Sequence, residues 1–248
     1  MLTTDVENFP GFPEGVMGPE LMSSFRSQAQ KFGAEFITEK VTAVNFANRP
    51  FEINVGNNKH LARSVIISTG AQSLMLNIPN ESRLIGHGLS TCATCDGFFF
   101  RDQEIAVVGG GDSALEEAIF LTRFASKVYL IHRRDELRAS KIMQERAFQN
   151  PKLEFLWNNE VTQINGDQKL DGIILNNTVT SEKLDLKIQG LFIAIGHRPN
   201  TDLFKGHLEL KDNGYLVTLP DSSRTAIDGV FACGDVQDDY YRQAITAA

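Results

Sequence analysis

The chain has 248 residues, of which 42% are hydrophobic and 22% charged, enough for one large domain or two ordinary ones. Its formal net charge of −7 argues against a nucleic-acid partner, which usually meets a basic face. No apolar run reaches the length of a transmembrane helix and no signal peptide opens the chain, so we expect a cytoplasmic protein without a membrane partner. Three cysteines are too few for a disulfide scaffold.

The first third of the chain predicts one helix followed by short strands. Residues 19–33 carry apolar side chains at helical spacing and end at a glycine. Gly56–Asn58 predicts a tight hairpin turn between two of the strands. Strand-like runs lie at residues 35–37, 41–46, 51–55 and 63–68. The last run leads into the turn Thr69–Gly70–Ala71.

The pattern changes at Glu104 and predicts a βαβ unit. Glu104–Val108 is a compact apolar strand, a helix with apolar side chains on one side begins near Ala114, and Lys127–His132 is the next strand. A further helix is expected around residues 141–149. Strand-type segments follow it along the chain.

Two apolar strands that end in glycine, Val65–Gly70 and Leu191–Gly196, resemble each other. Each could close a nucleotide-binding domain, which suggests two related domains with the middle one inserted into the outer one. Only one glycine-rich fingerprint is present, so we expect the chain to lack an N-terminal strand and glycine loop. A helix is expected to begin within residues 240–248, and we expect the C-terminal end to be cut as well.

The glycine loop Gly109-x-Gly111-x-x-Ala114 follows a strand and opens a helix. The first glycine allows the tight turn, the second lets a pyrophosphate approach the backbone, and Ala114 permits close helix packing. The helix N-terminus stabilises the anion. The alternative is an ordinary strand-to-helix turn that happens to be rich in glycine.

The strand after the loop ends at His132–Arg133–Arg134, where a site for NAD usually places an acid. Arginine presents a fork of donors that suits a 2′-phosphate, and Arg138 could join the pair. The expected cofactor is therefore NADPH, the alternative being a solvated basic patch. The residues expected to bind it are Gly109, Gly110, Gly111, Asp112, Ser113, His132, Arg133, Arg134 and Arg138.

Cys92 and Cys95 form a C-x-x-C pair that could close a redox-active disulfide. A helix start at this point would increase the thiolate fraction, and Asp96 could return a proton to a leaving thiolate. The alternatives are two inert buried thiols and half of a zinc site, but a zinc site lacks its other ligands, so we expect no metal. Cys233 lies in an apolar strand and is interpreted as core. The run Phe98–Phe100 is most simply core packing, although it could also wall a cofactor site.

Four segments together resemble the low-molecular-weight thioredoxin reductases of bacteria, which are class II pyridine nucleotide-disulfide oxidoreductases. Their spacing matches throughout, and the resemblance covers essentially the whole chain. The segments are Cys92–Phe99 (CATCDGFF), Gly109–Ala114 (GGGDSA), His132–Asp135 (HRRD) and Tyr241–Ala244 (YRQA).

The resemblance implies two Rossmann-like dinucleotide-binding domains of the three-layer ββα type in a homodimer. An NADPH domain with the cysteine pair, residues 74–197, would be inserted into an FAD domain formed by residues 1–73 and 198–248. The connections between them would lie near residues 73–75 and 197–199. Hydride from NADPH would reach FAD, then the cysteine pair, and finally the disulfide of thioredoxin.

The resemblance also assigns roles to individual residues. Cys95 would face the flavin, Cys92 would attack the thioredoxin disulfide, and Asp96 would be the acid. The implied FAD contacts are Asn8, Thr69, Gly70, Ala71, Gly234, Asp235, Arg242, Gln243 and Ala244. Because the family's N-terminal strand and glycine loop are not found, these flavin contacts are expectations of the resemblance alone.

Two other hypotheses stay open from the sequence. The first keeps the scaffold but changes the partner, giving a flavoprotein that reduces a peroxiredoxin or oxidises a small dithiol. The second is an NADP-binding module that cannot hold flavin and has no activity. A flavin absorption band separates the second from the enzymes.

Overall fold

The computed structural model describes residues 5–6, 9–241 and 243–247, and the chain divides into two units. Unit 1 comprises Met1–Glu7, Gly15–Pro19 and Ser73–Gly196. Unit 2 comprises Asn8–Glu14, Glu20–Gln72 and His197–Ala248. Most of unit 1 is thus a continuous insertion into the chain of unit 2. Among the helices so described, none is both long and apolar enough to cross a membrane.

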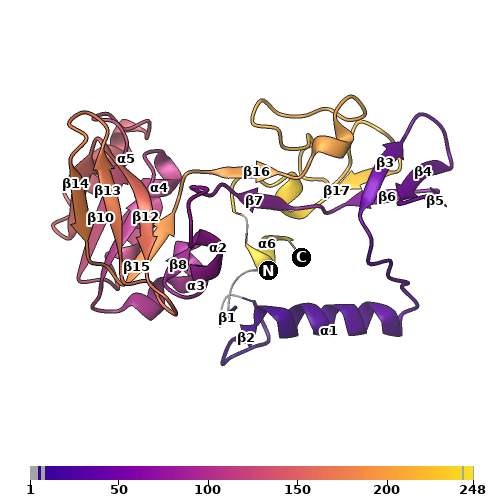
Figure 1. Cartoon of the computed structure of the whole chain (residues 1–248). Coiled ribbons are helices and arrows are strands. Elements are labelled where there is room, and N and C mark those ends of the chain that lie inside the picture. Colours follow the sequence, from indigo (N-terminus) through magenta and orange to yellow (C-terminus); the bar gives the residue numbers. More distant parts are fainter. Residues whose placement is uncertain (1–4, 7–8, 242, 248) are drawn as a thin grey trace. The chain divides into compact units, whose positions relative to one another are not determined.

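A five-stranded parallel sheet forms the centre of unit 1, with strand order β11-β10-β9-β15-β8 (Figure 1). The inner strands are almost continuously apolar because both faces of the sheet are covered. The strands are β8 (Leu89–Ser90), β9 (Glu104–Val108), β10 (Lys127–His132), β11 (Leu153–Trp157) and β15 (Gly190–Ile193).

Two helices, α4 (Asp112–Leu121) and α5 (Lys141–Phe148), cover one face of this sheet. The buried side chains of α4 recur at helical spacing and pack against Ile105 and Val107 of β9. Each fully buried Leu or Ile contributes about 1.5–3 kcal/mol relative to exposure, so this stripe holds the layer in place. The buried residues of α4 are Ala114, Leu115, Ala118 and Leu121.

An antiparallel meander covers the opposite face of the sheet. Its Ile164, Ile173 and Leu175 pack against alternate residues of the central strands, such as Ala106 and Ile131. The meander strands are β12 (Asn159–Asn165), β13 (Gly172–Asn177) and β14 (Lys183–Leu186). Unit 1 therefore has three layers, as the predicted α/β class requires.

Short elements complete unit 1 around β8. The most important are α3 (Ala93–Asp96) and the 3-10 helix η1 (Gly97–Phe100), which follow β8 directly. The others are β1 (Asp5–Val6), β2 (Val16–Met17) and α2 (Glu81–Leu84). Helix α1 (Gly18–Lys31) begins at the border of the unit and matches the helix predicted for residues 19–33.

Unit 2 contains an antiparallel sheet of three strands and a separate pair of parallel strands, β6 and β17. Phe46, Phe51, Ile67 and Val230 belong to its core. The strands are β3 (Val41–Asn45), β4 (Phe51–Val55), β5 (Asn58–Ala62), β6 (Val65–Ile67) and β17 (Val230–Ala232). Its short helices are η2 (Asp202–Phe204), η3 (Gly234–Val236) and α6 (Ala244–Ala247).

One local prediction was wrong and another was confirmed. Residues 35–37 form no strand, and the side chains of Phe36 and Ile37 are exposed instead of pairing into a sheet. The helix expected to begin within 240–248 is α6, which begins at Ala244; ahead of it, the Asp238 side chain accepts hydrogen bonds from the backbone N–H groups of Tyr240 and Tyr241. Local composition favoured a strand at residues 35–37, and tertiary context overrode it.

The two connections to unit 1 pair with each other as strands β7 (Ala71–Ser73) and β16 (His197–Pro199). Immediately inside the inserted unit, the backbone N–H of Leu74 donates to the carbonyl of Gly196 at 2.9 Å. The insertion therefore begins and ends at neighbouring points.

Candidate active site

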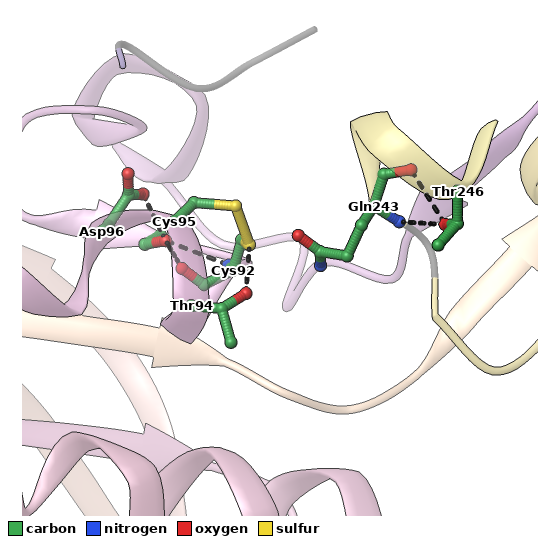
Figure 2. The surroundings of a disulfide bond; sticks show 7 residues. Cys92, Thr94, Cys95, Asp96, Gln243 and Thr246 are labelled. Atoms are coloured by element: carbon green, nitrogen blue, oxygen red, sulfur yellow. Dashed lines mark hydrogen bonds between the residues drawn. A yellow bond between two sulfur atoms is a disulfide. The ribbon is translucent and has the colours of Figure 1, made fainter. Parts of the chain in front are cut away.

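The cysteine pair lies on the short helix α3, directly after the edge strand β8 (Figure 2). Cys92 precedes the helix with an extended backbone, and Cys95 lies inside it. The two sulfur atoms are joined at 2.04 Å, so the predicted pair forms a disulfide. Both residues are partly exposed, and an exchange partner can therefore approach the disulfide.

Asp96 is held beside the pair by the hydroxyl of Ser90, a residue that the sequence did not single out. Ser90 Oγ donates to Asp96 Oδ2 at 2.6 Å and accepts a hydrogen bond from the backbone N–H of Cys92 at 3.0 Å. A second contact of the same hydroxyl, to the Cys92 carbonyl, is much longer at 3.3 Å, so its proton belongs to the carboxylate. Ser90 is only 3% exposed, which fixes this geometry.

A glycine allows the segment after the pair to pack against α4. The backbone of Gly97 has an ordinary helical conformation, but a Cβ there would come within 2.9 Å of a Leu121 methyl group. Phe100 is buried in contact with Phe192, as a core interpretation requires. Phe98 and Phe99 are about half exposed, so core packing was wrong for two of the three phenylalanines.

A cavity of about 430 Å³ opens next to Asp96. Its apolar lining includes Leu89, Phe99 and Phe100, and Ser90 lines it together with Asp96. The other polar side chains that line it belong to His87, Gln103, Lys169 and Gln189. Solvent or a partner group can therefore reach Asp96 from a side of unit 1 that the sequence did not indicate.

The glycine loop joins β9 to α4 with three glycines in three different environments. A Cβ at Gly109 would lie 2.5 Å from both Ala114 Cβ and the Ala194 carbonyl oxygen, and one at Gly110 would overlap the His132 ring. Around Gly111, by contrast, nothing lies within 4 Å of such an atom. The first two glycines therefore pack against the protein, whereas the space around Gly111, at the N-terminus of α4, is open. A pyrophosphate needs such open space to approach the backbone N–H groups there.

Asp112 and His132, both predicted to bind the cofactor, make contacts within the protein. Asp112 Oδ1 accepts hydrogen bonds from the hydroxyl and the backbone N–H of Ser140, which lower the pKa of this carboxyl. His132 is buried, its Nε2 lies 3.0 Å from the Glu136 carbonyl oxygen, and burial lowers its pKa. Ser113 is exposed at the start of α4.

Three exposed arginines follow β10 next to this loop, namely Arg133, Arg134 and Arg138. Their backbone is anchored, since the N–H of Arg138 donates to the Gly110 carbonyl at 2.8 Å. Within the part of the chain that the structure describes, none of the three guanidinium groups forms an ion pair. They are therefore positioned beside the open end of the glycine loop with their charge uncompensated, which fits a phosphate ester.

The predicted flavin contacts come together at one edge of the parallel strand pair in unit 2. Ile67 and Ala232 are register partners, so the turns after β6 and β17 leave the sheet side by side. Asn200 holds the first turn, because its backbone and side-chain N–H groups donate to the carbonyls of Gly70 and Thr69. This edge contains Thr69, Gly70, Ala71, Gly234 and Asp235.

Glycines with positive φ give this edge its shape. Gly70 has φ +69°, and nothing lies within 4 Å of a Cβ built on it. Gly234 has the same φ and begins η3, with Ala247 of α6 near it. Gln243 and Ala244, at the start of α6, thus lie near this edge, which fits a flavin contact. Cys233 is partly buried beside it, while Asn8 and Arg242 lie outside the described residues.

Comparison with known proteins assigns the chain to a family. The family model for pyridine nucleotide-disulphide oxidoreductases matches residues 1–248. Thioredoxin reductases of Streptomyces coelicolor and Mycolicibacterium smegmatis are 57% and 56% identical over the whole chain, which spans 77% and 80% of their lengths. The chain belongs to the pyridine nucleotide-disulphide oxidoreductase family, among its thioredoxin reductases. The resemblance noted in the sequence is thereby confirmed.

Solved structures of the same family agree with this fold. Thioredoxin reductase from Streptococcus pyogenes superposes with a TM-score of 0.91 at 41% identity, covering 99% of this chain and 80% of the other. The enzyme from Giardia duodenalis gives the same TM-score at 39% identity, covering 99% and 81%. Members of a pyridine nucleotide-disulphide oxidoreductase family use a nicotinamide cofactor and a flavin, and the two open glycine turns fit such groups.

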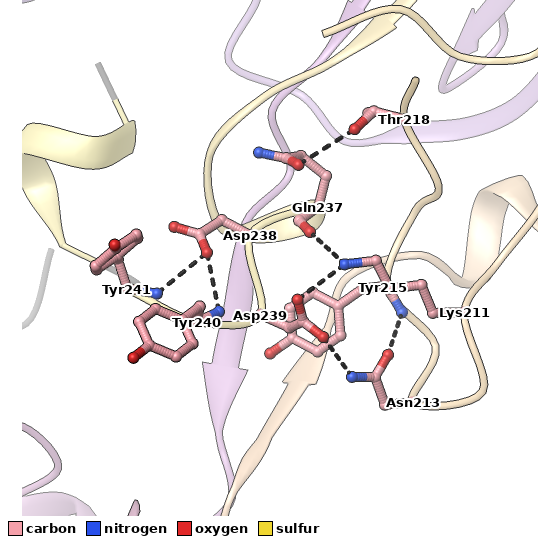
Figure 3. A network of polar contacts seen from close by, with 9 residues as sticks. All are labelled: Lys211, Asn213, Tyr215, Thr218, Gln237, Asp238, Asp239, Tyr240 and Tyr241. Carbon is pink, nitrogen blue, oxygen red and sulfur yellow. Dashed lines mark hydrogen bonds and ion pairs between the residues drawn. The ribbon is translucent and has the colours of Figure 1, made fainter. Parts of the chain in front are cut away.

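A polar network fixes the chain that leads from η3 toward Gln243 in this family member (Figure 3). Asp239 accepts hydrogen bonds from Lys211 Nζ at 2.8 Å and from Asn213 Nδ2 at 2.7 Å, and the Lys211 contact lowers its pKa. Asp238 Oδ1 accepts from the backbone N–H groups of Tyr240 and Tyr241 at 2.9 and 3.1 Å. The start of α6 is therefore held by side chains along most of its approach.

Proposed function

We propose that this protein catalyses NADPH-dependent, FAD-mediated reduction of the disulfide of thioredoxin through Cys92 and Cys95. The observation that carries the proposal is the disulfide on α3 with Asp96 held next to it by Ser90, in the same unit as a glycine loop flanked by free arginines. The net reaction oxidises NADPH to NADP⁺ and converts one disulfide into two thiols, consuming one proton.

In this proposal NADPH is held by Gly109–Ser113 and by the three arginines after β10. FAD is held by the turns at Thr69–Ala71 and Gly234–Asp235, together with Gln243 and Ala244. Asn8 and Arg242 belong to the same assignment. When bound, the flavin accepts two electrons from NADPH and supplies them to the Cys92–Cys95 disulfide.

The reduced pair then acts on thioredoxin in two exchange steps. The Cys92 thiolate attacks one sulfur of the thioredoxin disulfide, forming a mixed disulfide and releasing the other sulfur as a thiolate. Asp96 donates the proton that this leaving thiolate takes up. Cys95 next attacks Cys92 Sγ, which restores the intramolecular disulfide and releases reduced thioredoxin.

The geometry around Cys92 supports this division of roles. Cys92 is the residue before the helix, and its Sγ lies 3.5 Å from the hydroxyl of Thr94. Asp96 is one helical turn away, with its backbone N–H donating to the Cys92 carbonyl at 3.2 Å. Nucleophile and acid are thus bound to the same short segment, and neither depends on a distant loop for its position.

The experiment uses the full chain purified with FAD, NADPH as reductant and a bacterial thioredoxin as substrate. Loss of NADPH absorbance with release of thioredoxin thiols is the expected result. Cys95→Ser should accumulate a mixed disulfide between Cys92 and thioredoxin, whereas Cys92→Ser should form none. Thioredoxin reduction that persists when both cysteines are serine would overturn the proposal, and failure to bind flavin would favour an NADP-binding module.

The proposal extends to the setting of the enzyme. We infer a homodimer in the cytoplasm, which follows from the family resemblance and agrees with a cysteine pair that must be kept reducible. Light scattering of the purified protein tests the dimer directly. A monomer with full thioredoxin reductase activity would remove that part of the proposal.

A further inference from the structure

Three aromatic rings form a cluster on the helix-covered face of unit 1, at its edge strand β11. Phe155 and Trp157 are two residues apart on this strand, with ring centroids 5.0 Å apart and planes only 10° from parallel. The exposed Phe148, at the end of α5, packs against Phe155 at 4.8 Å and also lies beside Trp157 at 6.3 Å, with its plane tilted by 46° to the indole. Trp157 is the last residue of the strand and the ring of the cluster that lies nearest its carboxyl end.

Trp157 lies in line with the glycine loop across the ends of three strands. It is the register partner of His132 on β10, and the two rings meet edge to face at 6.5 Å. The His132 ring in turn fills the space where Gly110 would carry a Cβ. Gly110, His132 and Trp157 therefore mark the carboxyl ends of β9, β10 and β11 on the same face of the sheet.

The stacking leaves one face of the indole directed beyond the sheet. Phe155 precedes Trp157 along the strand, so it covers the indole face that looks back toward the strand's start. The opposite face looks past the carboxyl end of β11, and the residue is only partly buried. In open α/β sheets this is the edge at which ligands bind.

Hydrogen bonds link the backbone of the proposed phosphate-binding arginines to the residues that follow Trp157. The backbone N–H of Asn158, the residue after Trp157, donates to the Arg134 carbonyl at 3.3 Å. Thr178 Oγ1 lies 3.2 Å from the carbonyls of both Arg133 and Asn158. In an adenosine 2′-phosphate, base and phosphate are attached to neighbouring ribose carbons, so a base beside these arginines is within reach of the indole.

We propose that the outer face of Trp157 is the platform on which the adenine base of the nicotinamide cofactor stacks. The inference rests on the proposed use of NADPH and adds an aromatic contact to the phosphate contacts. Stacking on an aromatic ring is tolerant in geometry and stabilises a bound base by an amount comparable to a charged hydrogen bond. Phe155 stacks on the inner face of the indole, and the His132 ring contacts it edge to face, so both hold it in place.

The test uses adenosine 2′,5′-bisphosphate and 5′-ADP as probes of the full flavin-loaded chain. Trp157 is the only tryptophan, so its fluorescence reports stacking directly. We expect adenosine 2′,5′-bisphosphate to quench this emission to saturation and nicotinamide mononucleotide, which has no adenine, to leave it unchanged. Binding of the bisphosphate without any change in emission would overturn the proposal.

Calorimetry with variants gives a second and independent measurement. Trp157→Leu should weaken both adenine nucleotides by about tenfold, and Trp157→Phe by only a few fold, since a ring remains. Arg133→Ala should instead weaken only the nucleotide with a 2′-phosphate. A Trp157→Leu variant that binds both nucleotides like the parent overturns the proposal.

Phe32→Leu is the control, because it removes an 80% exposed ring just after the end of helix α1, away from Trp157 in the chain, and should leave both affinities unchanged. Melting curves of all variants identify any loss of folded protein. If the affinity for adenosine 2′,5′-bisphosphate depends on Arg133 but not on Trp157, the proposal that adenine stacks on Trp157 is wrong while the NADPH proposal stands. If no adenine nucleotide binds the parent chain, the cofactor choice itself fails.

Discussion

Ser90 Oγ lies 2.6 Å from Asp96 Oδ2 and at the same time accepts the backbone N–H of Cys92. One buried hydroxyl therefore sets the distance between the proposed acid and the first residue of the cysteine pair. Ser90 touches neither sulfur in the described structure, so we regard it as a positioning residue. Its effect should appear in the exchange with thioredoxin and not in earlier electron transfer.

Ser90→Ala should lower the turnover of thioredoxin about tenfold, because a hydrogen bond to a charged group is worth about 1.5–3 kcal/mol. Reduction of the bound flavin by NADPH, followed by stopped-flow absorbance, should keep its rate. Ser90→Thr retains a hydroxyl and should recover part of the loss. Ser126→Ala, which removes an exposed hydroxyl in a loop, is the control. Equal losses in both half-reactions would mean that Ser90 merely supports the fold.

Changing Arg133 and Arg134 together to alanine should raise the KM for NADPH by about a hundredfold, since two charge-assisted contacts are lost. The kcat/KM for NADH, which has no 2′-phosphate, should change little. Arg146→Ala removes one positive charge from the exposed surface of α5 and controls for the general field. The 2′-phosphate assignment is wrong if both dinucleotides lose affinity equally.

Alanine at two neighbouring glycines should have opposite effects. Gly110→Ala drives a methyl group into the His132 ring and should destabilise unit 1 by about 1–3 kcal/mol. Gly111→Ala meets no protein atom and should leave the free energy of unfolding within about 0.5 kcal/mol of the parent. It should nevertheless weaken NADP⁺ binding about tenfold, because the methyl occupies the cofactor's side of the loop.

Urea unfolding and calorimetry of these two variants separate the effects. A stable Gly111→Ala protein with unchanged NADP⁺ affinity would show that the open side of the loop does not face the dinucleotide. Loss of stability in Gly111→Ala would contradict the open space found around this position.

Folding stability should fall as the pH is lowered from 7 to 5, and His132 should account for part of the fall. Burial lowers the pKa of His132, so the unfolded chain binds a proton at a pH where the folded chain does not. The stabilising difference is complete above the unfolded-state pKa near 6.5 and is lost as the pH drops below it. His132→Gln, measured by urea unfolding at each pH, should show a flatter profile. A profile identical to that of the parent would contradict a neutral buried imidazole.

The sequence predicted the parts of the site that depend on local chain geometry. Gly109–Ala114 and the arginines after β10 are separated by a fixed βα unit, so their spacing alone places them together. The role of Ser90 could not be predicted in the same way, because it depends on how β8 ends against α3. The only signal was a small hydroxyl residue two positions before Cys92 and six before Asp96.

The same distinction explains the phenylalanines and the C-terminal segment. Which of Phe98, Phe99 and Phe100 is buried follows from the direction of a short 3-10 helix against α4, and hydrophobicity does not encode that direction. The late start of α6 follows from the hydrogen bonds of Asp238 to Tyr240 and Tyr241.

The hydrogen bond between Leu74 N and Gly196 O brings the two ends of the inserted segment together. A long insertion is tolerated when its two ends lie close together, and here the continuous segment Ser73–Gly196, which is most of unit 1, leaves and re-enters unit 2 at adjacent residues. For the chain of unit 2, this long insertion therefore spans only the distance that a short hairpin would span. We expect that the segment 73–196 could be exchanged for that of another dinucleotide specificity without altering the path of the unit 2 chain at the two junctions.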